Sequence, residues 1–269
     1  MVISDKYRFV FLHIPKCAGT SVRVALDPFD DRRERYLAQG VEDHEELGRL
    51  DYHHIPLKTL REYFADDYRC VEDYRAFAVI RDPRTRFPAS LAQKLSMYNG
   101  LKLDKLTADE VKREIDEVIS RLSAVPKQTP VLQPELIHFS RQIDYIEIDG
   151  YRPVDNIYAI ENINWLFSEI ENITSRKLAT DDVKNYRFNY KYPVLSSLDY
   201  IARSMLETVL PTRLWVPFSS LIKRALIRAN ILQKTPEAHS DIFESSFVRD
   251  FINDFYKDDR LLYRKLSTK

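Results

Sequence analysis

A short loop between an apolar segment and a helix-forming segment carries the residue types that bind phosphate groups. The loop reads His13-Ile14-Pro15-Lys16-Cys17-Ala18-Gly19-Thr20-Ser21. Lys16 supplies a mobile positive charge, and Thr20 and Ser21 supply hydroxyl groups. Backbone N–H groups at a helix N-terminus, together with the helix dipole, bind phosphate without a dedicated cationic side chain. The loop therefore predicts a site for a phosphate-bearing ligand.

A pair of histidines is the second feature that could take part in chemistry. The chain has six histidines, and only in Tyr52-His53-His54-Ile55-Pro56 are two of them adjacent. An alcohol is a poor nucleophile near neutral pH, so transfer of a group to a hydroxyl needs a base. A histidine with an ordinary pKa of about 6.5 suits that role. Either His53 or His54 is therefore a candidate base.

The loop differs from the best-known nucleotide-binding patterns. A nucleotide triphosphatase loop reads G-x-x-x-x-G-K-[ST], with the lysine directly before the residue that holds magnesium. Here Lys16 lies three residues before Gly19, and Gly19 is followed at once by Thr20. The dinucleotide pattern G-x-G-x-x-G is absent as well. This sequence therefore lacks both the lysine position and the metal ligand that a metal-dependent kinase needs.

Apolar segments that alternate with helical ones must position these residues. The sequence predicts three strands and a helix after each of them, which implies an α/β fold, P-loop-like and three-layered, with a central parallel sheet flanked by helices. Ligands bind beyond the carboxyl ends of such strands, where the loop lies. The strands are expected at Tyr7–Leu12, Tyr74–Ile80 and Asn156–Ile160, and the helices at Thr20–Leu26, from Asp82 to about Tyr98, and at Ile163–Ile173.

Other segments give weaker patterns. Helical periodicity is expected at Glu45–Leu50, Pro56–Phe64 and Asp109–Leu122, and an extra strand at Ile143–Ile148. The C-terminal part reads as mainly helical, with two helices over 196–230 broken at Pro211 and Pro217, and a final helical segment over 244–266. No internal repeat is visible, and the length of 269 residues predicts a single domain over 1–269.

Composition restricts the class of protein. Hydrophobic residues make up 44% and charged residues 30%, as in globular proteins. The 41 basic and 41 acidic residues balance, which argues against a nucleic-acid-binding protein. No apolar run approaches the 20 or so residues of a spanning helix, and no secretory signal is visible, so a cytoplasmic location is expected. Cys17 and Cys70 are expected to be free thiols, and no zinc-binding pattern occurs.

Two motifs resemble one enzyme family. His13 to Ser21 is similar to the 5′-phosphosulfate loop, H-x-P-K-[TC]-[GA]-G-[TS]-[ST], of the Golgi-type and bacterial carbohydrate sulfotransferases, which include heparan sulfate 2-O-sulfotransferase. Arg81-Asp82-Pro83-Arg84-Thr85-Arg86 resembles the family's R-D-P-x-x-R segment, whose first arginine binds a 3′-phosphate. The resemblance implies 3′-phosphoadenosine 5′-phosphosulfate (PAPS) as the donor and no metal. It assigns PAPS binding to Lys16, Cys17, Ala18, Gly19, Thr20, Ser21 and Arg81.

The resemblance also implies catalytic roles and one departure. It aligns His54 with the family's general base, and it places Lys16 at the oxygen that leaves with the phosphate. The acceptor would be a hydroxyl group, on a glycan or glycoconjugate. The family's serine eight residues after its arginine is Ala89 here, and Ser90 follows it. One residue along a helix rotates a side chain by about 100°, so Ser90 serves the 3′-phosphate only with a local adjustment.

Weaker similarities extend further along the chain. Glu161-Asn162 resembles the end of a family strand, and Glu161 is either a second carboxylate of the cleft or a stabiliser of a helix start. Phe255-Tyr256-Lys257-Asp258-Asp259 resembles the family's C-terminal Tyr-x-x-Asp signature.

A basic, amphipathic segment leaves two further alternatives open. Residues 208–236, within a predicted helical stretch of about 196–235, contain five basic and no acidic side chains. They could contact an anionic membrane surface or approach an anionic glycan, and an ordinary solvated helix face is the alternative. A nucleotide-dependent kinase and a non-catalytic, nucleotide-regulated membrane or interaction protein are the competing functions.

Overall fold

The computed structural model describes residues 1–36, 40–126, 129–178, 188–190, 232–234 and 238–267. The chain forms two compact units, one of residues 1–180 and 238–269 and the other of residues 181–237. In the second unit the described part is a pair of strands, in which β7 (Phe188–Tyr190) pairs antiparallel with β8 (Leu232–Lys234). The predicted helices over 196–230 and most of the basic segment 208–236 lie outside the described residues. The end of the predicted helical stretch of about 196–235 is wrong, because Leu232–Lys234 is a strand that pairs with β7. The single-domain prediction stays a prediction.

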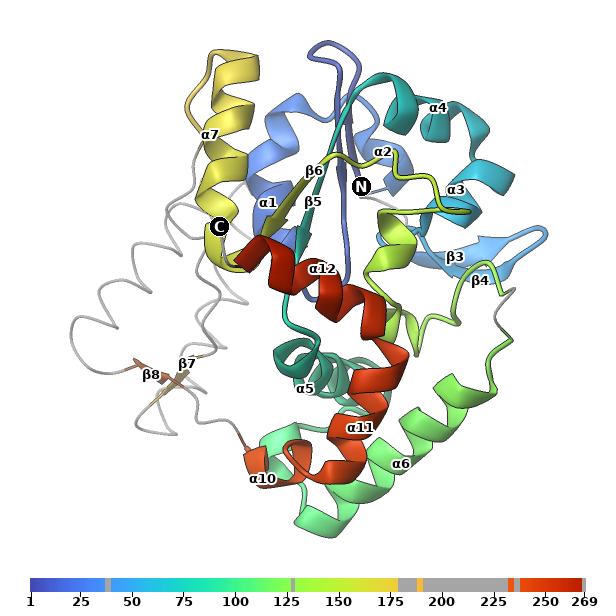
Figure 1. The fold of residues 1–269 in the computed structure, drawn as a ribbon, viewed down its shortest axis with the longest axis vertical. Helices are drawn as coiled ribbons and strands as arrows, with labels where there is room; N and C mark the ends of the chain where they lie inside the picture. Colours follow the sequence, from blue (N-terminus) through green and yellow to red (C-terminus); the bar gives the residue numbers. More distant parts are fainter. Residues whose placement is uncertain (37–39, 127–128, 179–187, 191–231, 235–237, 268–269) are drawn as a thin grey trace, which may run out of the picture. The chain divides into compact units, whose positions relative to one another are not determined.

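A four-stranded sheet forms the centre of the first unit, in the order β1-β2-β5-β6 (Figure 1). The strands β2 (Phe9–Leu12), β5 (Arg75–Ile80) and β6 (Asn156–Ala159) run parallel, which confirms the predicted α/β class. β1 (Val2–Ser4), which was not predicted, pairs antiparallel with β2 at the edge. All of β2 and nearly all of β5 are buried, as expected for central strands that are covered on both faces.

Helices flank the sheet, with α1 and α7 on one side and α3 and α4 on the other (Figure 1). The predicted helices near 20–26, 56–64, 83–98 and 163–173 are all present. Their bounds are α1 (Gly19–Leu26), α3 (Leu57–Tyr63), α4 (Ala65–Asp73), α5 (Pro83–Lys94) and α7 (Ile163–Thr174), and two short helices, η1 (Asp27–Phe29) and α2 (Arg33–Tyr36), follow α1. The α5 helix begins as predicted, because the Asp82 carboxylate accepts the Arg84 N–H at 2.9 Å.

A second core lies beyond the carboxyl ends of the strands. It packs α5 and the π-helical turn η2 (Leu95–Asn99) against α6 (Ala108–Ala124), α10 (Ser240–Phe243) and α11 (Ser246–Phe255). Phe87, Phe139 and Val248 are among its buried side chains. The last helix, α12 (Lys257–Ser267), packs against β6. The C-terminal chain thus returns to the edge of the sheet where ligands bind in α/β proteins.

Two predicted elements are wrong. Residues 45–50 belong to a hairpin of β3 (Val41–His44) and β4 (Gly48–Asp51), because His44 Nδ1 accepts two turn N–H groups and Gly48 adopts a φ of +66°. Ile143–Ile148 is not a strand. It begins with the 3₁₀ turn η5 (Ile143–Tyr145), since the Asp259 carboxylate takes the Ile143 N–H that a neighbouring strand would need.

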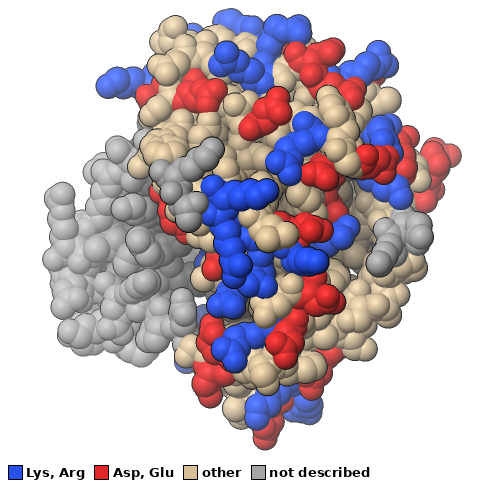
Figure 2. All heavy atoms as spheres, in the orientation of Figure 1, with Lys and Arg blue, Asp and Glu red and all other residues tan. Residues whose placement is uncertain are grey.

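Several short elements complete the described part, and the surface charge is mixed. The 3₁₀ turns η3 (Leu103–Lys105), η4 (Ile137–Phe139) and η6 (Ile160–Asn162) connect larger elements. Figure 2 shows acidic and basic side chains interspersed over much of one face, with a group of Lys and Arg near its middle. Among the described helices, none is long and apolar enough to cross a membrane.

Candidate active site

The phosphate loop turns sharply between β2 and α1. Lys16 and Ala18 adopt positive φ values of 62° and 60°, so the loop folds back before α1 begins at Gly19. A Cβ atom on Gly19 would lie 1.7 Å from Cδ2 of His13, which no side chain could accommodate. Glycine therefore lets the His13 ring pack against the start of the helix. The first N–H groups of a helix have no partner within it, so they are available to an anion.

Lys16 points from this loop toward α5. Its Nζ donates to Oε1 of Gln93 at 2.9 Å, and the side chain is half-buried. Burial lowers the pKa of His138 to about 3, and the positive charge of Lys16 contributes to the same shift. The ammonium group therefore lies near His138, within the described site.

Three buried histidines meet next to the loop. The His54 ring lies 4.4 Å from that of His13 and 5.4 Å from that of His138, measured between ring centroids. Each residue is only 6% exposed. Burial lowers the pKa of His13 and of His54 well below 6.5, and in each case a neighbouring histidine lowers it further. All three rings are thus held neutral near pH 7.

His54 is oriented as a base requires. Its Nδ1 lies 3.0 Å from the carbonyl oxygen of His13, so Nδ1 carries the proton and Nε2 keeps a free lone pair. The Tyr145 hydroxyl donates to the His54 carbonyl at 3.2 Å and fixes the peptide. His53 differs, because it is half-buried and its Nδ1 lies 3.6 Å from the Asp51 carboxylate. Geometry therefore favours His54 over His53.

One buried side chain, Gln142, connects the two predicted phosphate-binding segments. Its Oε1 accepts the Arg81 N–H at 2.8 Å and the Cys17 thiol at 3.1 Å. Its Nε2 donates to the Arg81 carbonyl at 2.9 Å and toward the Asp259 carboxylate at 3.3 Å. Burial raises the pKa of Cys17 to about 12, so this thiol is a structural donor and not a nucleophile. Gln142 thereby fixes the spacing between the loop and Arg81.

Arg86 and the Tyr-x-x-Asp signature form the support beneath that connection. Arg86 donates to the carbonyls of His138 and Ser140 at 3.2 and 2.6 Å, lies 5.1 Å from the Tyr256 ring centroid, and approaches Asp259 at 3.9 Å. Asp259 in turn accepts the Gln142 N–H at 2.8 Å. The last arginine of R-D-P-x-x-R is therefore a buried structural residue.

The first arginine of that segment, Arg81, is more accessible. It is half-buried, and its Nε donates to the Thr85 hydroxyl at 2.9 Å. Ser90 is fully buried, and its hydroxyl is within 2.7 Å of the His138 carbonyl and 3.1 Å of the Arg86 carbonyl. A hydroxyl has one proton to donate, and these carbonyls take it. A role for Ser90 at the 3′-phosphate stays a prediction that this geometry does not support.

Three further predicted residues, Thr20, Ser21 and Glu161, are exposed or half-buried. Thr20 is exposed and Ser21 half-buried at the start of α1. Glu161 is exposed in η6 and accepts the Tyr263 hydroxyl at 3.0 Å. Glu161 thus lies directly before α7, which fits the alternative that its carboxylate stabilises a helix start. In the described ranges no group of His, Cys, Asp and Glu could hold a metal ion.

Sequence reasoning missed His138 and Gln142. His138 has no partner nearby in sequence, and its Nδ1 is buried without a hydrogen bond in the described part of the chain. Gln142 contacts residues more than 60 positions away. No local pattern in the sequence marks either residue as part of a site.

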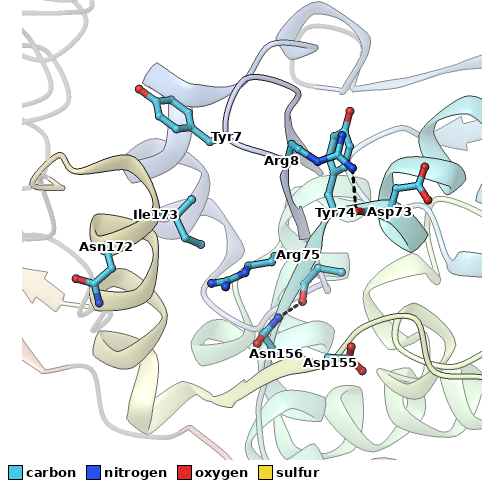
Figure 3. Close-up of a pocket in the computed structure, with 10 residues that line it drawn as sticks. Tyr7, Arg8, Asp73, Tyr74, Arg75, Asp155, Asn156, Asn172 and Ile173 are labelled. Carbon is cyan, nitrogen blue, oxygen red and sulfur yellow. Dashed lines mark hydrogen bonds between the residues drawn. The ribbon is translucent and has the colours of Figure 1, made fainter.

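A hollow lies at the other end of the sheet. It measures about 670 Å³ and is lined by the amino ends of β5 and β6, with Tyr7, Arg8 and the end of α7 (Figure 3). There the Arg8 guanidinium lies over the Tyr74 ring at 4.5 Å and donates to the Asp73 carbonyl, so its cation already has partners. The phosphate loop and His54 are at the carboxyl ends, and this hollow is not part of their site.

The fold is that of an α/β protein with a central, mostly parallel sheet flanked by helices (Figure 1). Comparison with family models narrows the class, because residues 1–265 match the model described as the sulfotransferase family. The chain belongs to the sulfotransferase family, whose members transfer sulfuryl groups. Comparison with curated proteins and with solved structures found no match in either case.

Proposed function

We propose that this sulfotransferase transfers the sulfuryl group of PAPS to a hydroxyl acceptor, with His54 as general base and Lys16 at the leaving oxygen. One observation carries the proposal: His54, tied through Nδ1 to the carbonyl of the first loop residue, is held neutral beside the loop. A neutral imidazole with a free Nε2 can take a proton from an alcohol.

Two anion-binding segments support PAPS as the donor. The 5′-phosphosulfate would bind the N–H groups of Gly19, Thr20 and Ser21, and the 3′-phosphate would bind Arg81. Both segments lie at the carboxyl edge of the sheet, after β2 and β5, and Gln142 bonds to both. A ligand with phosphates at two ends fits that pairing better than one with a single phosphate.

The chemistry is a single in-line displacement. The acceptor oxygen attacks sulfur and gives its proton to Nε2 of His54. As the new S–O bond forms, the bond between sulfur and the 5′-phosphate oxygen breaks, and that oxygen takes the electron pair. Lys16 stabilises the charge that develops on this oxygen. The products are the sulfated acceptor and adenosine 3′,5′-bisphosphate, and the proton remains on His54 until solvent removes it.

The acceptor is proposed to be a carbohydrate hydroxyl, because the two motifs resemble those of carbohydrate sulfotransferases. Activity in the cytoplasm and contact of 208–236 with a membrane are further proposals that rest on the sequence alone.

Titration with adenosine 3′,5′-bisphosphate tests the donor assignment. We expect the unmodified chain to bind this product without magnesium, and Lys16→Met and Arg81→Gln each to weaken binding by about tenfold or more, since each removes a charge-assisted contact. Transfer from labelled PAPS to a panel of glycans then identifies the acceptor. Magnesium-dependent ATP turnover without bisphosphate binding would show that the chain is a kinase of related fold.

Replacing Gln142 with methionine tests its positioning role. Methionine has similar length but lacks the amide, so the Arg81 peptide and the Cys17 thiol lose their shared partner. We expect binding of the bisphosphate to weaken by about tenfold, or ~1.4 kcal/mol, and the KM for PAPS to rise more than kcat falls. Calorimetric titration and steady-state kinetics measure both effects.

A matched control separates positioning from general stability. Thr59→Val removes another buried hydrogen bond, from Thr59 to the Pro130 carbonyl at 2.7 Å, outside the site. Both variants should lower the free energy of unfolding by roughly 1–3 kcal/mol. Only Gln142→Met should alter ligand binding. Equal affinities in the two variants would refute the positioning role.

A further inference from the structure

A small basic pocket lies between the start of α5 and the face of α12. It measures about 200 Å³ and is lined by Asp82 and Arg84 from the first and by Arg260, Tyr263 and Arg264 from the second. Arg260 and Arg264 are one helical turn apart and so share a face of α12. Figure 2 shows the group of Lys and Arg side chains in the area where Figure 1 places α12. Neither family motif assigns a role to Arg84, Arg260 or Arg264.

Two arginines of this pocket, Arg84 and Arg260, carry charges that no ion pair neutralises in the described part of the chain. The two nearby carboxylates have other partners, because Asp82 accepts the Arg84 backbone N–H as helix cap and Glu161 accepts the Tyr263 hydroxyl. In the described ranges, no carboxylate lies within 4 Å of the Arg84 or Arg260 guanidinium. Burial lowers the pKa of Arg260, and the charges of Arg264 and Arg84 lower it further, while the Asp82 carboxylate opposes this shift. The arginines therefore repel one another in the absence of an anion.

An ordinary solvated surface accounts poorly for this arrangement. Like charges at i and i+4 destabilise a helix, and here a third arginine from another helix approaches the same pair. Charges that only solubilise a surface can spread apart. Charges that converge on a pocket from two elements are typical of a site that an anion neutralises.

The pocket adjoins the proposed donor site. Asp82, in its wall, follows Arg81 directly in the sequence. Burial raises the pKa of Tyr263 to about 12, and Arg81 is among the charges close enough to oppose that shift. An anion bound here would be near the 3′-phosphate end of a bound donor.

We infer that Arg84, Arg260 and Arg264 form a binding site for a phosphate or sulfate monoester carried by a reactant. The inference deepens the proposed function and rests on it for the identity of the reactant. Guanidinium groups suit this ligand, because each can donate two parallel hydrogen bonds to an oxyanion. The monoester has two possible sources, the 3′-phosphate of the donor or an anionic group on the acceptor.

Charge removal with matched nucleotides distinguishes these sources. The triple variant Arg84→Gln, Arg260→Gln, Arg264→Gln is compared with a control of equal charge change, Arg249→Gln, Lys257→Gln, Lys265→Gln, whose residues are exposed on α11 and α12. Both are titrated with adenosine 3′,5′-bisphosphate and with adenosine 5′-monophosphate at fixed ionic strength. If the donor is the source, the triple variant should lose about 30-fold in bisphosphate affinity and less than twofold in monophosphate affinity.

An anionic acceptor gives a different result. In that case, the triple variant keeps its bisphosphate affinity within twofold. Millimolar sulfate is then added to protein saturated with bisphosphate, and it raises the Tm of the unmodified chain and of the control more than that of the triple variant.

The inference is overturned if sulfate raises all three Tm values equally while bisphosphate affinity is unchanged. It is also overturned if variant and control lose affinity for both nucleotides alike, which would indicate long-range attraction alone. Failure of the unmodified chain to bind bisphosphate would refute the proposed donor, and the sulfate comparison without nucleotide would still test the pocket.

Discussion

His54→Asn should reduce kcat by roughly 10²- to 10⁴-fold and leave the affinity for adenosine 3′,5′-bisphosphate within about threefold. The asparagine amide can replace Nδ1 as the donor to the His13 carbonyl, a contact of 3.0 Å in the unmodified chain. It has no counterpart of Nε2, so the substitution removes the base without releasing the loop. Single-turnover transfer from labelled PAPS and calorimetric titration measure the two quantities.

The other histidine of the pair supplies the control for this prediction. His53→Asn changes a half-buried ring beside Asp51 and should leave kcat within about threefold. The pH profile gives an independent check, because burial holds the pKa of His54 well below 6.5 in the free chain. The base form then persists as the pH falls, and kcat/KM should start to decline only below pH 6.5. Loss of activity in His53→Asn, with activity kept in His54→Asn, would identify His53 as the base.

The sheet could be predicted from sequence because its strands have a simple physical signature. β2 and β5 are continuous apolar runs that end at polar loops, as strands covered on both faces must be. The helices after them begin at recognisable residues, such as Asp82 and Pro83 for α5. The β3–β4 hairpin has no such signature. Its strands are largely exposed, and the turn depends on a ring nitrogen of His44 that periodicity does not reveal.

The geometry of the candidate site could be predicted where its residues are consecutive, and could not where they come from distant segments. The turn at Lys16 and Ala18 and the start of α1 at Gly19 are local backbone features, which a local pattern encodes. Gln142 joins Arg81 across 61 positions and Asp259 across 117, and no local pattern records such a pairing. Ser90 shows that a local pattern can also mislead. Its place on the helix fixes where its side chain points, and the hydroxyl points to interior carbonyls and not to the site.

The His13–His54–His138 cluster bears on the proposed role of His54 as a buried base. Burial, and then the neighbouring His138, lower the pKa of His54 and so disfavour its protonation in the free chain. A bound donor would bring several negative charges to the loop, and these would raise the pKa of His54 toward the pH at which the enzyme works. The acid limb of kcat should therefore lie at higher pH than that of kcat/KM.

Gly19→Ala should lower the free energy of unfolding by at least about 2 kcal/mol and abolish measurable binding of the bisphosphate. The new Cβ would lie 1.7 Å from Cδ2 and 2.1 Å from Nε2 of His13. That ring is buried and lies against His54, so it cannot swing aside without disturbing the carbonyl that orients the base. Urea denaturation and calorimetric titration measure the two losses.

Whether Gly19→Ala lowers or raises the free energy of unfolding distinguishes a steric clash with His13 from a gain in helix propensity. Gly19 is the first residue of α1, and without the clash alanine would be more favourable there than glycine, by up to about 1 kcal/mol. His13→Ala makes the space that the methyl group needs, so the double variant should be more stable than the two single losses predict, by more than about 1 kcal/mol. Gly100→Ala is the control, since that glycine has a φ of +65° and nothing within 4 Å, and it should cost only 1–2 kcal/mol or so without affecting binding. A Gly19→Ala chain that is more stable than the original would mean that His13 does not pack against the helix start, and the orientation of His54 would then need another cause.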